Sequence, residues 1–292
     1  MHMSIASLDV SDVNLKYFVV GSGDPIVLLH CTGGSGRQWA ELAEALRANF
    51  QVIVPDLYGY GGTTHWPGAG TFSLGTEADL VCALIDKLEK PVHLVGHSFG
   101  GAVALKLAMR YPEHVKSLTV IEPASFHLLL HGDDMDDLAF RQISEIAAII
   151  ANAVNSGDYL GAMRRFVDFW NGPGAWNALP NPQRIALANR INKVTLDFWA
   201  TLNDPMRRGD LFNLAVPTLV ILGERSPLPT RRICFHLARV LPNVRQRAIA
   251  GAGHMLPTTH CNEILQVITH HCNVNRHHRP KIEADLKMRV PA

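Results

Sequence analysis

The segment VHLVGHSFGGAVALKLA, residues 92–108, constrains the fold more than any other part of the chain. An apolar, β-branched run leads into GHSFG at 96–100, and an apolar stretch with helical spacing follows. Glycines two positions on either side of a serine let a strand and a helix pass closely at a strained turn. Ser98 would then project its hydroxyl from the carboxyl edge of a sheet, at a helix N-terminus that favours negative charge. It is the candidate nucleophile, although a serine here could also simply cap the helix.

The order of elements around this turn predicts an α/β fold with a mostly parallel sheet flanked by helices. Short β-branched strands are predicted at NLKYFVV, PIVLLH, FQVIVPD, PVHLVGH and KSLTVIE, and later at VPTLVILG and NVRQRAIAG. Between and after them, helical spacing is found near 38–49, 76–90, 99–111, 231–241 and 260–272. The alternation breaks between Ala124 and about Asn213, where aromatic-rich helical stretches replace the strands.

Four motifs together resemble the α/β-hydrolase superfamily: GHSFGG, LLHCTGGSGRQW, VPDLYGYGGT and GAGHM. The resemblance covers nearly all of the chain up to about Cys272. It implies an α/β-hydrolase fold with a helical cap inserted after strand six, where this sequence loses its alternation. We therefore expect a core formed by 1–124 and 213–272, a helical cap over 125–212, and a polar C-terminal arm over 273–292 that is a surface or disordered segment.

A serine hydroxyl needs a neighbouring base, and His254 in AIAGAGHMLPTTH is the candidate. Of the fifteen histidines, it alone follows the last apolar strand and keeps the order in which serine precedes histidine. His97, next to Ser98, is expected to point away from the nucleophile and pack in the core. The oxyanion of acyl transfer needs two donors. We expect the backbone N–H of Phe99 to be one, and the resemblance maps the other to the N–H of Thr32.

Two glutamates compete for the third position of a triad, because the family's usual acid after strand seven is replaced by Ser226 in GERS. Glu122 ends the strand in KSLTVIE, and its place resembles that of the acid after strand six in haloalkane dehalogenases of the same superfamily. A carboxylate at the end of an apolar strand needs a partner, which His254 would supply. Glu224 is the local alternative. Asp56 is expected to stabilise its own turn in VPDLYGYGGT.

Composition narrows the partners and cofactors. Lys and Arg (27) nearly balance Asp and Glu (26), so no net field favours nucleic acid or an anionic membrane, and small neutral or apolar substrates are expected. Five cysteines without CxxC spacing predict neither a disulfide framework nor a zinc site, and the pairs His270/His271 and His277/His278 are expected to be solvated surface. GGSG lacks the lysine of a phosphate-binding loop. No cofactor is predicted.

Aromatic side chains of the expected cap are candidates for an apolar pocket over Ser98, although most should serve packing. The candidates are Phe166, Trp170, Trp176, Phe198 and Trp199. The apolar runs are too short to span a membrane and no signal peptide is recognised, so a cytoplasmic location is the default expectation.

Three functions remain open at this stage. The preferred one is a cofactor-free serine hydrolase that cleaves a carboxylic ester, a lactone or a thioester through an acyl-enzyme at Ser98. A C–C bond hydrolase of ring-cleavage diketones would use the same residue types, and a non-catalytic small-molecule receptor could use the same fold. An epoxide hydrolase or dehalogenase is disfavoured, because both need an aspartate where Ser98 stands.

Overall fold

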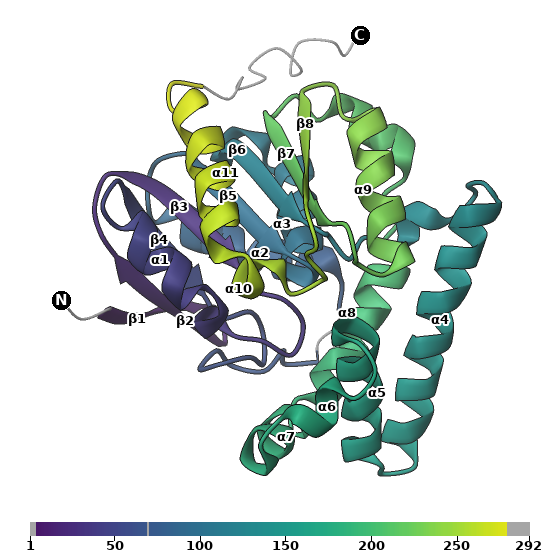
Figure 1. Ribbon diagram of the computed structural model, residues 1–292. Coiled ribbons are helices and arrows are strands. Elements are labelled where there is room, and N and C mark those ends of the chain that lie inside the picture. Colours follow the sequence, from purple (N-terminus) through teal and green to yellow (C-terminus); the bar gives the residue numbers. More distant parts are fainter. Residues whose placement is uncertain (1–3, 69, 279–292) are drawn as a thin grey trace, which may run out of the picture.

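Eight strands form one sheet in the computed structural model, which describes residues 4–68 and 70–278 (Figure 1). Their order across the sheet is β1-β2-β4-β3-β5-β6-β7-β8. Strand β2 pairs antiparallel with β1 and β4, and the other pairs are parallel. The strands are β1 (Ser4–Val10), β2 (Val13–Val20), β3 (Asp24–Leu29), β4 (Phe50–Pro55), β5 (Val92–His97), β6 (Val115–Ile121), β7 (Thr218–Gly223) and β8 (Val244–Ile249).

Helices cover both faces of the sheet, which explains why its central strands are apolar on both sides. In β3, Ile26 and Leu28 join the core on one face and Val27 and Leu29 join the core on the other. The first face is covered by α1 (Ala40–Leu46) and α11 (Cys261–Val274), and the second by α2 (Leu74–Asp86), α3 (Phe99–Arg110) and α9 (Leu228–Val240). The predicted fold class, an α/β-hydrolase fold with a mostly parallel sheet flanked by helices, is confirmed.

Strand β1 is the strand of the described chain that the sequence patterns do not predict. It pairs only with β2, through the register Ser4 to Val19 and Val10 to Val13, and therefore forms an edge of the sheet. Its residues alternate between exposed and half-buried. An edge strand of this kind needs no continuous apolar run, so SIASLDV lacks the signal by which the inner strands were recognised.

The segment between β6 and β7 is helical and lies together on one side of the sheet (Figure 1). Short 3-10 helices at Phe126–Leu129 and Arg208–Asn213 lead into and out of it. Glycines and prolines between residues 172 and 182 separate its short middle helices. The segment contains α4 (Asp134–Asn155), α5 (Tyr159–Asn171), α6 (Ala175–Ala178), α7 (Asn181–Ala188) and α8 (Ile191–Leu202). Its division from the core as a separate cap stays a prediction.

Helix α4 is fixed to the rest of the fold at its first turn. Asp133 caps the helix and forms a capping box with Asp136. The buried Asp136 carboxylate also accepts hydrogen bonds from Arg232 Nε at 2.7 Å and His236 Nε2 at 2.8 Å, both on α9. Burial alone would raise the pKa of Asp136, but the donors from Arg232 and His236 outweigh it and hold this pKa at about 2. The charged form therefore joins α4 to α9.

The C-terminal end differs from its prediction where the structure describes it. Helix α11 continues to Val274, two residues beyond the predicted core, and residues 279–292 of the predicted arm lie outside the described residues. His271 is buried on the inner face of α11, with Nε2 3.3 Å from the Pro217 carbonyl oxygen, so the expectation of a solvated pair His270/His271 is wrong for this residue. Within the described chain, every helix is too short or too polar to cross a bilayer.

Candidate active site

Ser98 lies at the sharp turn between β5 and α3, and the neighbouring glycines are required by space. Its backbone has φ 55° and ψ −117°, a strained conformation for a residue other than glycine. A Cβ on Gly96 would lie 2.1 Å from the Gly100 carbonyl oxygen, and a Cβ on Gly100 would lie 2.5 Å from that of His30. Neither position therefore tolerates a side chain. The turn holds the Ser98 hydroxyl at the carboxyl edge of the sheet.

Three of the residues selected from the sequence form a continuous hydrogen-bonded chain. Ser98 Oγ lies 3.0 Å from His254 Nε2, and His254 Nδ1 lies 2.6 Å from Glu122 Oε2. Because a carboxylate accepts, Nδ1 carries the ring proton and Nε2 is left to accept from the serine. Glu122 Oε1 accepts from the Gly223 N–H at 2.6 Å. All three side chains are buried, so bulk water does not compete for these contacts.

Glu122 reaches His254 because it follows directly on β6, a neighbour of the strand that ends at the nucleophile. Its φ of 46° turns the chain at the strand end, and its N–H donates to the Ile221 carbonyl of β7 at 2.9 Å. Glu224 is exposed, and its Oε2 accepts from the Gly251 N–H at 3.1 Å. The structure therefore brings Glu122 and not Glu224 to the histidine.

Ser226 stands where the family's usual acid is expected. It lies beside Gly223, whose N–H donates to Glu122. It is buried, and its Oγ has no hydrogen-bond partner among the described residues. A Cβ built on Gly223 would come within 2.9 Å of Ser226 Oγ, and the Gly223 N–H is the donor to Glu122. The positions after β6 and β7 thus meet at Gly223, and of the two only Glu122 is hydrogen-bonded to His254.

His97 and Gln38 support the loop that carries the base. His97 is buried and uncharged, because burial holds its pKa well below the usual range. Its Nε2 donates to the His254 carbonyl oxygen at 2.8 Å, and its Nδ1 accepts from Gln38 Nε2 at 3.0 Å. The prediction that His97 points away from Ser98 and packs in the core did not include these two hydrogen bonds. Gln38 also accepts from the Cys31 N–H at 3.0 Å, which ties the loop after β3 to the same unit.

Of the two expected oxyanion donors, Thr32 borders the cavity in front of Ser98 and Phe99 follows Ser98 in the chain. Phe99 is the first residue of α3, so its N–H has no acceptor within the helix. Thr32 lies in the loop after β3 and lines the same cavity as Ser98. Arg190, from the helical segment, donates to the carbonyl oxygens of Gly33 at 2.7 Å and Gly34 at 3.2 Å. This clamp on the loop after β3 was not expected from the sequence.

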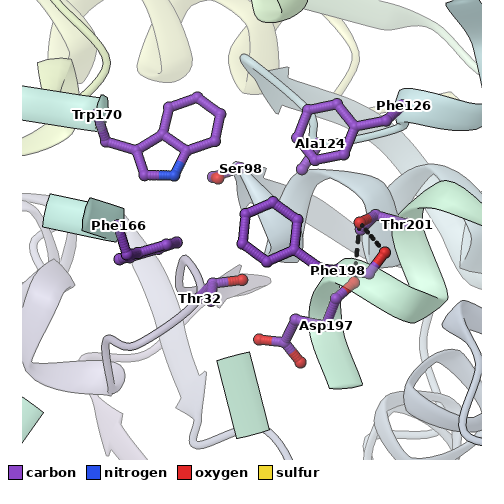
Figure 2. A pocket seen from close by; sticks show the side chains of 9 residues that line it. All are labelled: Thr32, Ser98, Ala124, Phe126, Phe166, Trp170, Asp197, Phe198 and Thr201. Carbon is purple, nitrogen blue, oxygen red and sulfur yellow. Dashed lines mark hydrogen bonds between the residues drawn. The ribbon is translucent and has the colours of Figure 1, made fainter. Parts of the chain in front are cut away.

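Two spaces with shared lining residues lie around Ser98. The smaller, about 10 Å³, is lined by Thr32, Ser98, Ala124, Phe126, Phe166, Trp170, Asp197, Phe198 and Thr201 (Figure 2). The larger, about 340 Å³, is lined by Cys31, Thr32, Gly33, Gly34, Ser98, Phe166, Val167, Trp170, Asn171, Ala175, Leu179, Leu187, His254 and Met255. We call them the small compartment and the large compartment. Figure 2 shows the Ser98 hydroxyl pointing into the space between aromatic side chains.

The expected aromatic lining is found for three of its five candidates. Phe166 and Trp170 border both compartments, and Phe198 borders the small one. Trp176 is buried in the core and lines neither compartment, and Trp199 is 54% exposed. Successive residues of a helix point about 100° apart, so the rotation of α8 that turns Phe198 inward turns Trp199 outward. The structure corrects the assignment of Trp176 and Trp199 to the pocket.

A buried ionic cluster borders the small compartment. Lys193 Nζ donates to Glu77 Oε1 at 3.0 Å and to the Asp197 carboxylate, and the Tyr60 hydroxyl donates to Asp197 Oδ2 at 2.6 Å. Burial raises the pKa of Glu77 to about 7 and raises that of Asp197, and the nearby Lys193 opposes both shifts. The available sequence signal was the pair Lys193 and Asp197, four residues apart on an otherwise apolar helix. The sequence contains no comparable spacing that predicts the contacts with Tyr60 and Glu77, which lie far away in the chain.

The structure also places the remaining candidates. Asp56 accepts from the backbone N–H groups of Gly36 at 2.7 Å and Gly62 at 3.0 Å, so it braces its turn as expected. Among the described residues, one His/Cys/Asp/Glu group has spacing suited to a metal ion, and it lies apart from the triad residues on the chain: Cys82, Asp86 and His114. The five cysteines are free thiols.

Comparison with known proteins identifies the family. The α/β hydrolase fold family model matches residues 24–260, so the chain belongs to the α/β hydrolase family. A pimeloyl-[acyl-carrier protein] methyl ester esterase of Aeromonas hydrophila is 27% identical over 86% of this chain and 96% of its own length. A cis-3-alkyl-4-alkyloxetan-2-one decarboxylase of Shewanella oneidensis is 33% identical over 88% of this chain and 84% of its own length.

The structural comparison agrees with this family. The crystal structure of a lipase-like protein from Acinetobacter baumannii superposes with a TM-score of 0.76 at 21% identity, covering 94% of this chain and 92% of the other. At that identity, the likeness concerns the fold alone. The α/β hydrolase family of this chain includes relatives described as esterases. The fold alone does not determine the reaction of this chain, which depends on its site.

Proposed function

We propose that this protein is a serine hydrolase that cleaves carboxylic esters through an acyl-enzyme on Ser98. The observation that carries the proposal is the buried chain of hydrogen bonds from Ser98 through His254 to Glu122. A relative described as a methyl ester esterase supports an ester as the substrate. The balanced charge of the chain and the apolar walls of the large compartment favour a small neutral or apolar ester.

In the proposed first half-reaction, Ser98 Oγ attacks the ester carbonyl carbon while His254 Nε2 takes its proton. The N–H groups of Thr32 and Phe99 stabilise the negative oxygen of the tetrahedral intermediate. The Glu122 carboxylate holds the His254 ring in the required tautomer and stabilises the imidazolium. When the intermediate collapses, the bond from carbon to the alcohol oxygen breaks, and His254 returns its proton to the departing alcohol.

In the second half-reaction, water replaces the alcohol. His254 takes a proton from this water, and the resulting oxygen nucleophile attacks the acyl carbon. The bond from this carbon to Ser98 Oγ then breaks, and His254 returns the proton to Ser98 Oγ. The products are a carboxylic acid and the regenerated serine. His97 and Gln38 act as positioning residues, because they hold the carbonyl of His254 and the loop of Thr32 without reaching the substrate.

A fluorophosphonate probe tests the proposal directly, because it reacts covalently with activated serines. We expect labelling of Ser98, identified by peptide mass spectrometry, together with turnover of p-nitrophenyl acetate. Ser98→Ala should abolish both. Ser226→Ala is the matched control and should retain both, because Ser226 is a buried serine whose hydroxyl has no hydrogen-bond partner among the described residues. Absence of labelling and of ester turnover in the folded protein would favour a receptor, and cleavage of a ring-cleavage diketone in preference to esters would favour the C–C hydrolase.

A further inference from the structure

The two compartments around Ser98 differ in which catalytic groups they touch. His254 and Met255 line the large compartment and are absent from the lining of the small one. Asp197 and Thr201 line only the small compartment. Thr32, Ser98, Phe166 and Trp170 border both. An ester attacked at Ser98 therefore has one side near the base and one side away from it.

The chemistry of ester cleavage assigns these sides. In the tetrahedral intermediate, the oxyanion faces its N–H donors and the alcohol oxygen must lie within reach of His254 Nε2, which protonates it. The remaining carbon substituent, the acyl chain, points in the third direction. Since His254 borders the large compartment, the alcohol part belongs there, and the acyl chain belongs in the small compartment.

The size of the small compartment limits that acyl chain. Its volume of about 10 Å³ is near the minimum that holds one water molecule, so it accepts a group about the size of a methyl. Its walls are buried aromatic rings: Phe126 is packed 6.3 Å from both Trp170 and Phe198, measured between ring centroids. A longer acyl chain would have to displace Phe198, whose neighbour Asp197 is fixed by Lys193 and Tyr60.

The ionic cluster also determines which charges the acyl end can carry. Figure 2 shows Asp197 at the bottom of the view with its carboxylate directed toward Thr32. A negatively charged acyl end would approach the Asp197 carboxylate in a buried site, where repulsion is weakly screened. Lys193 already donates to both Glu77 and Asp197, so it is not free to receive a third anion. An uncharged acyl group is favoured.

The large compartment has the opposite character. At about 340 Å³ it is within the usual range of small-molecule sites, and its lining away from Ser98 is mainly apolar. Leu179 and Leu187 of the helical segment and Val167 contribute to this lining. It can hold an alcohol of several carbons or an aromatic ring.

We propose that the substrate is a short-acyl ester, of acetyl size, of a larger apolar alcohol, with the acyl group in the small compartment and the alcohol in the large one. This inference rests on the proposed ester hydrolase function. It extends that function because the two compartments distinguish the acyl side of the ester from the alcohol side.

Two isomeric esters test the orientation. Heptyl acetate and methyl octanoate have the same formula and nearly the same hydrophobicity, but they exchange the long and short sides of the ester bond. We expect kcat/KM for heptyl acetate to exceed that for methyl octanoate by about tenfold or more, since each excess methylene meets a closed wall. Equal rates, or faster cleavage of methyl octanoate, would overturn the assignment of the compartments.

A variant pair isolates the small compartment. Phe198→Ala should raise the ratio of p-nitrophenyl octanoate to p-nitrophenyl acetate turnover by about tenfold or more, because it opens the acyl side. Leu187→Ala, which enlarges only the large compartment, is the matched control and should leave this ratio unchanged. Thermal unfolding monitors the fold of both variants. An unchanged ratio in folded Phe198→Ala would overturn the inference, whereas loss of fluorophosphonate labelling in the wild type would overturn the hydrolase function itself.

Discussion

Replacing Glu122 by glutamine changes one oxygen to an NH2 group and removes one charge from the buried contact with His254. The two carboxylate oxygens have separate partners: Oε1 accepts from the Gly223 N–H at 2.6 Å, and Oε2 accepts from His254 Nδ1 at 2.6 Å. An amide has only one oxygen, so it cannot serve both donors. If the amide oxygen stays on Gly223, the NH2 group faces Nδ1 and forces the ring proton onto Nε2, which can then no longer accept from Ser98.

The expected loss of kcat in Glu122→Gln follows from this conflict between the two donors. The reversed amide keeps the productive tautomer of His254 but leaves the buried Gly223 N–H without an acceptor, at a cost of about 1–3 kcal/mol. That cost alone reduces the competent fraction by about 5- to 150-fold. Loss of the negative charge also removes stabilisation of the imidazolium, and an amide at the equivalent place lowers kcat about 10⁴-fold in serine proteases. We expect kcat of Glu122→Gln to fall by about 10³- to 10⁴-fold.

The assay is p-nitrophenyl acetate hydrolysis under saturating substrate, with thermal unfolding measured in parallel. Glu224→Gln is the matched control, because it removes an exposed carboxylate that contacts Gly251 and should change kcat by about twofold or less. A folded Glu122→Gln that keeps more than about a tenth of the wild-type kcat would refute the reasoning. Collapse of activity in Glu224→Gln instead would transfer the role to Glu224.

Three further predictions concern the same site and its surroundings. Ser226→Asp should recover about tenfold or more of the activity lost in Glu122→Ala, because the Ser226 side chain lies beside Gly223, the residue that also contacts Glu122; no recovery in the folded double variant would show that the two positions are not equivalent. Lys193→Met should lower the free energy of unfolding in urea by about 3–5 kcal/mol, since Glu77 and Asp197 would stay buried without their cation, and a loss below about 1 kcal/mol would contradict this. Burial lowers the pKa of His30, His93 and His271 to about 4, so between pH 6.5 and 4 the folded protein binds fewer protons than the unfolded chain, and urea unfolding should show stability falling with acidification in that range. The raised pKa of Glu77, about 7, and the raised pKa of Asp197 act in the opposite direction, but the lowered pKa of His97 adds to the effect of the three histidines, so stability that rises on acidification would contradict the prediction.

The parts of the site that sequence could indicate are those fixed by strand ends. Ser98 and Glu122 each follow directly on a buried apolar strand, and His254 lies in the loop after β8, whose residues are mostly exposed. The carboxyl ends of parallel strands meet at one edge of a sheet. The strand ends, the order of serine before histidine and the resemblance to the α/β-hydrolase superfamily together predicted these residues, with Glu224 as the alternative acid, and the structure brings Ser98, His254 and Glu122 within hydrogen-bond distance. Both glutamates follow directly on their strands, but Ile121 pairs with Ile221, so Glu224 lies two positions further along the register than Glu122 and is exposed.

The parts that sequence could not indicate depend on helix rotation and on contacts between distant segments. Whether Phe198 or Trp199 faces the cavity depends on a rotation of α8 that packing decides, because both residues are large and aromatic. The hydrogen bond from Tyr60 to Asp197 joins positions separated by 137 residues, and that from Lys193 to Glu77 joins positions separated by 116. Local periodicity contains no information about such pairs. Strand β1 was missed for the opposite reason, since a half-exposed edge strand has too weak a pattern.

The contact from Arg190 to Gly33 and Gly34 links the position of the helical segment to the loop that carries Thr32. One guanidinium nitrogen of the helical segment holds two carbonyls of the loop that carries Thr32. An outward movement of these helices would withdraw Arg190 and free the loop that carries Thr32, the proposed oxyanion donor. Under the proposed function, turnover would then alternate between a closed state that cleaves the substrate and an open state that releases the product. If opening is the slow step, kcat would depend on solvent viscosity and not on the reactivity of the ester.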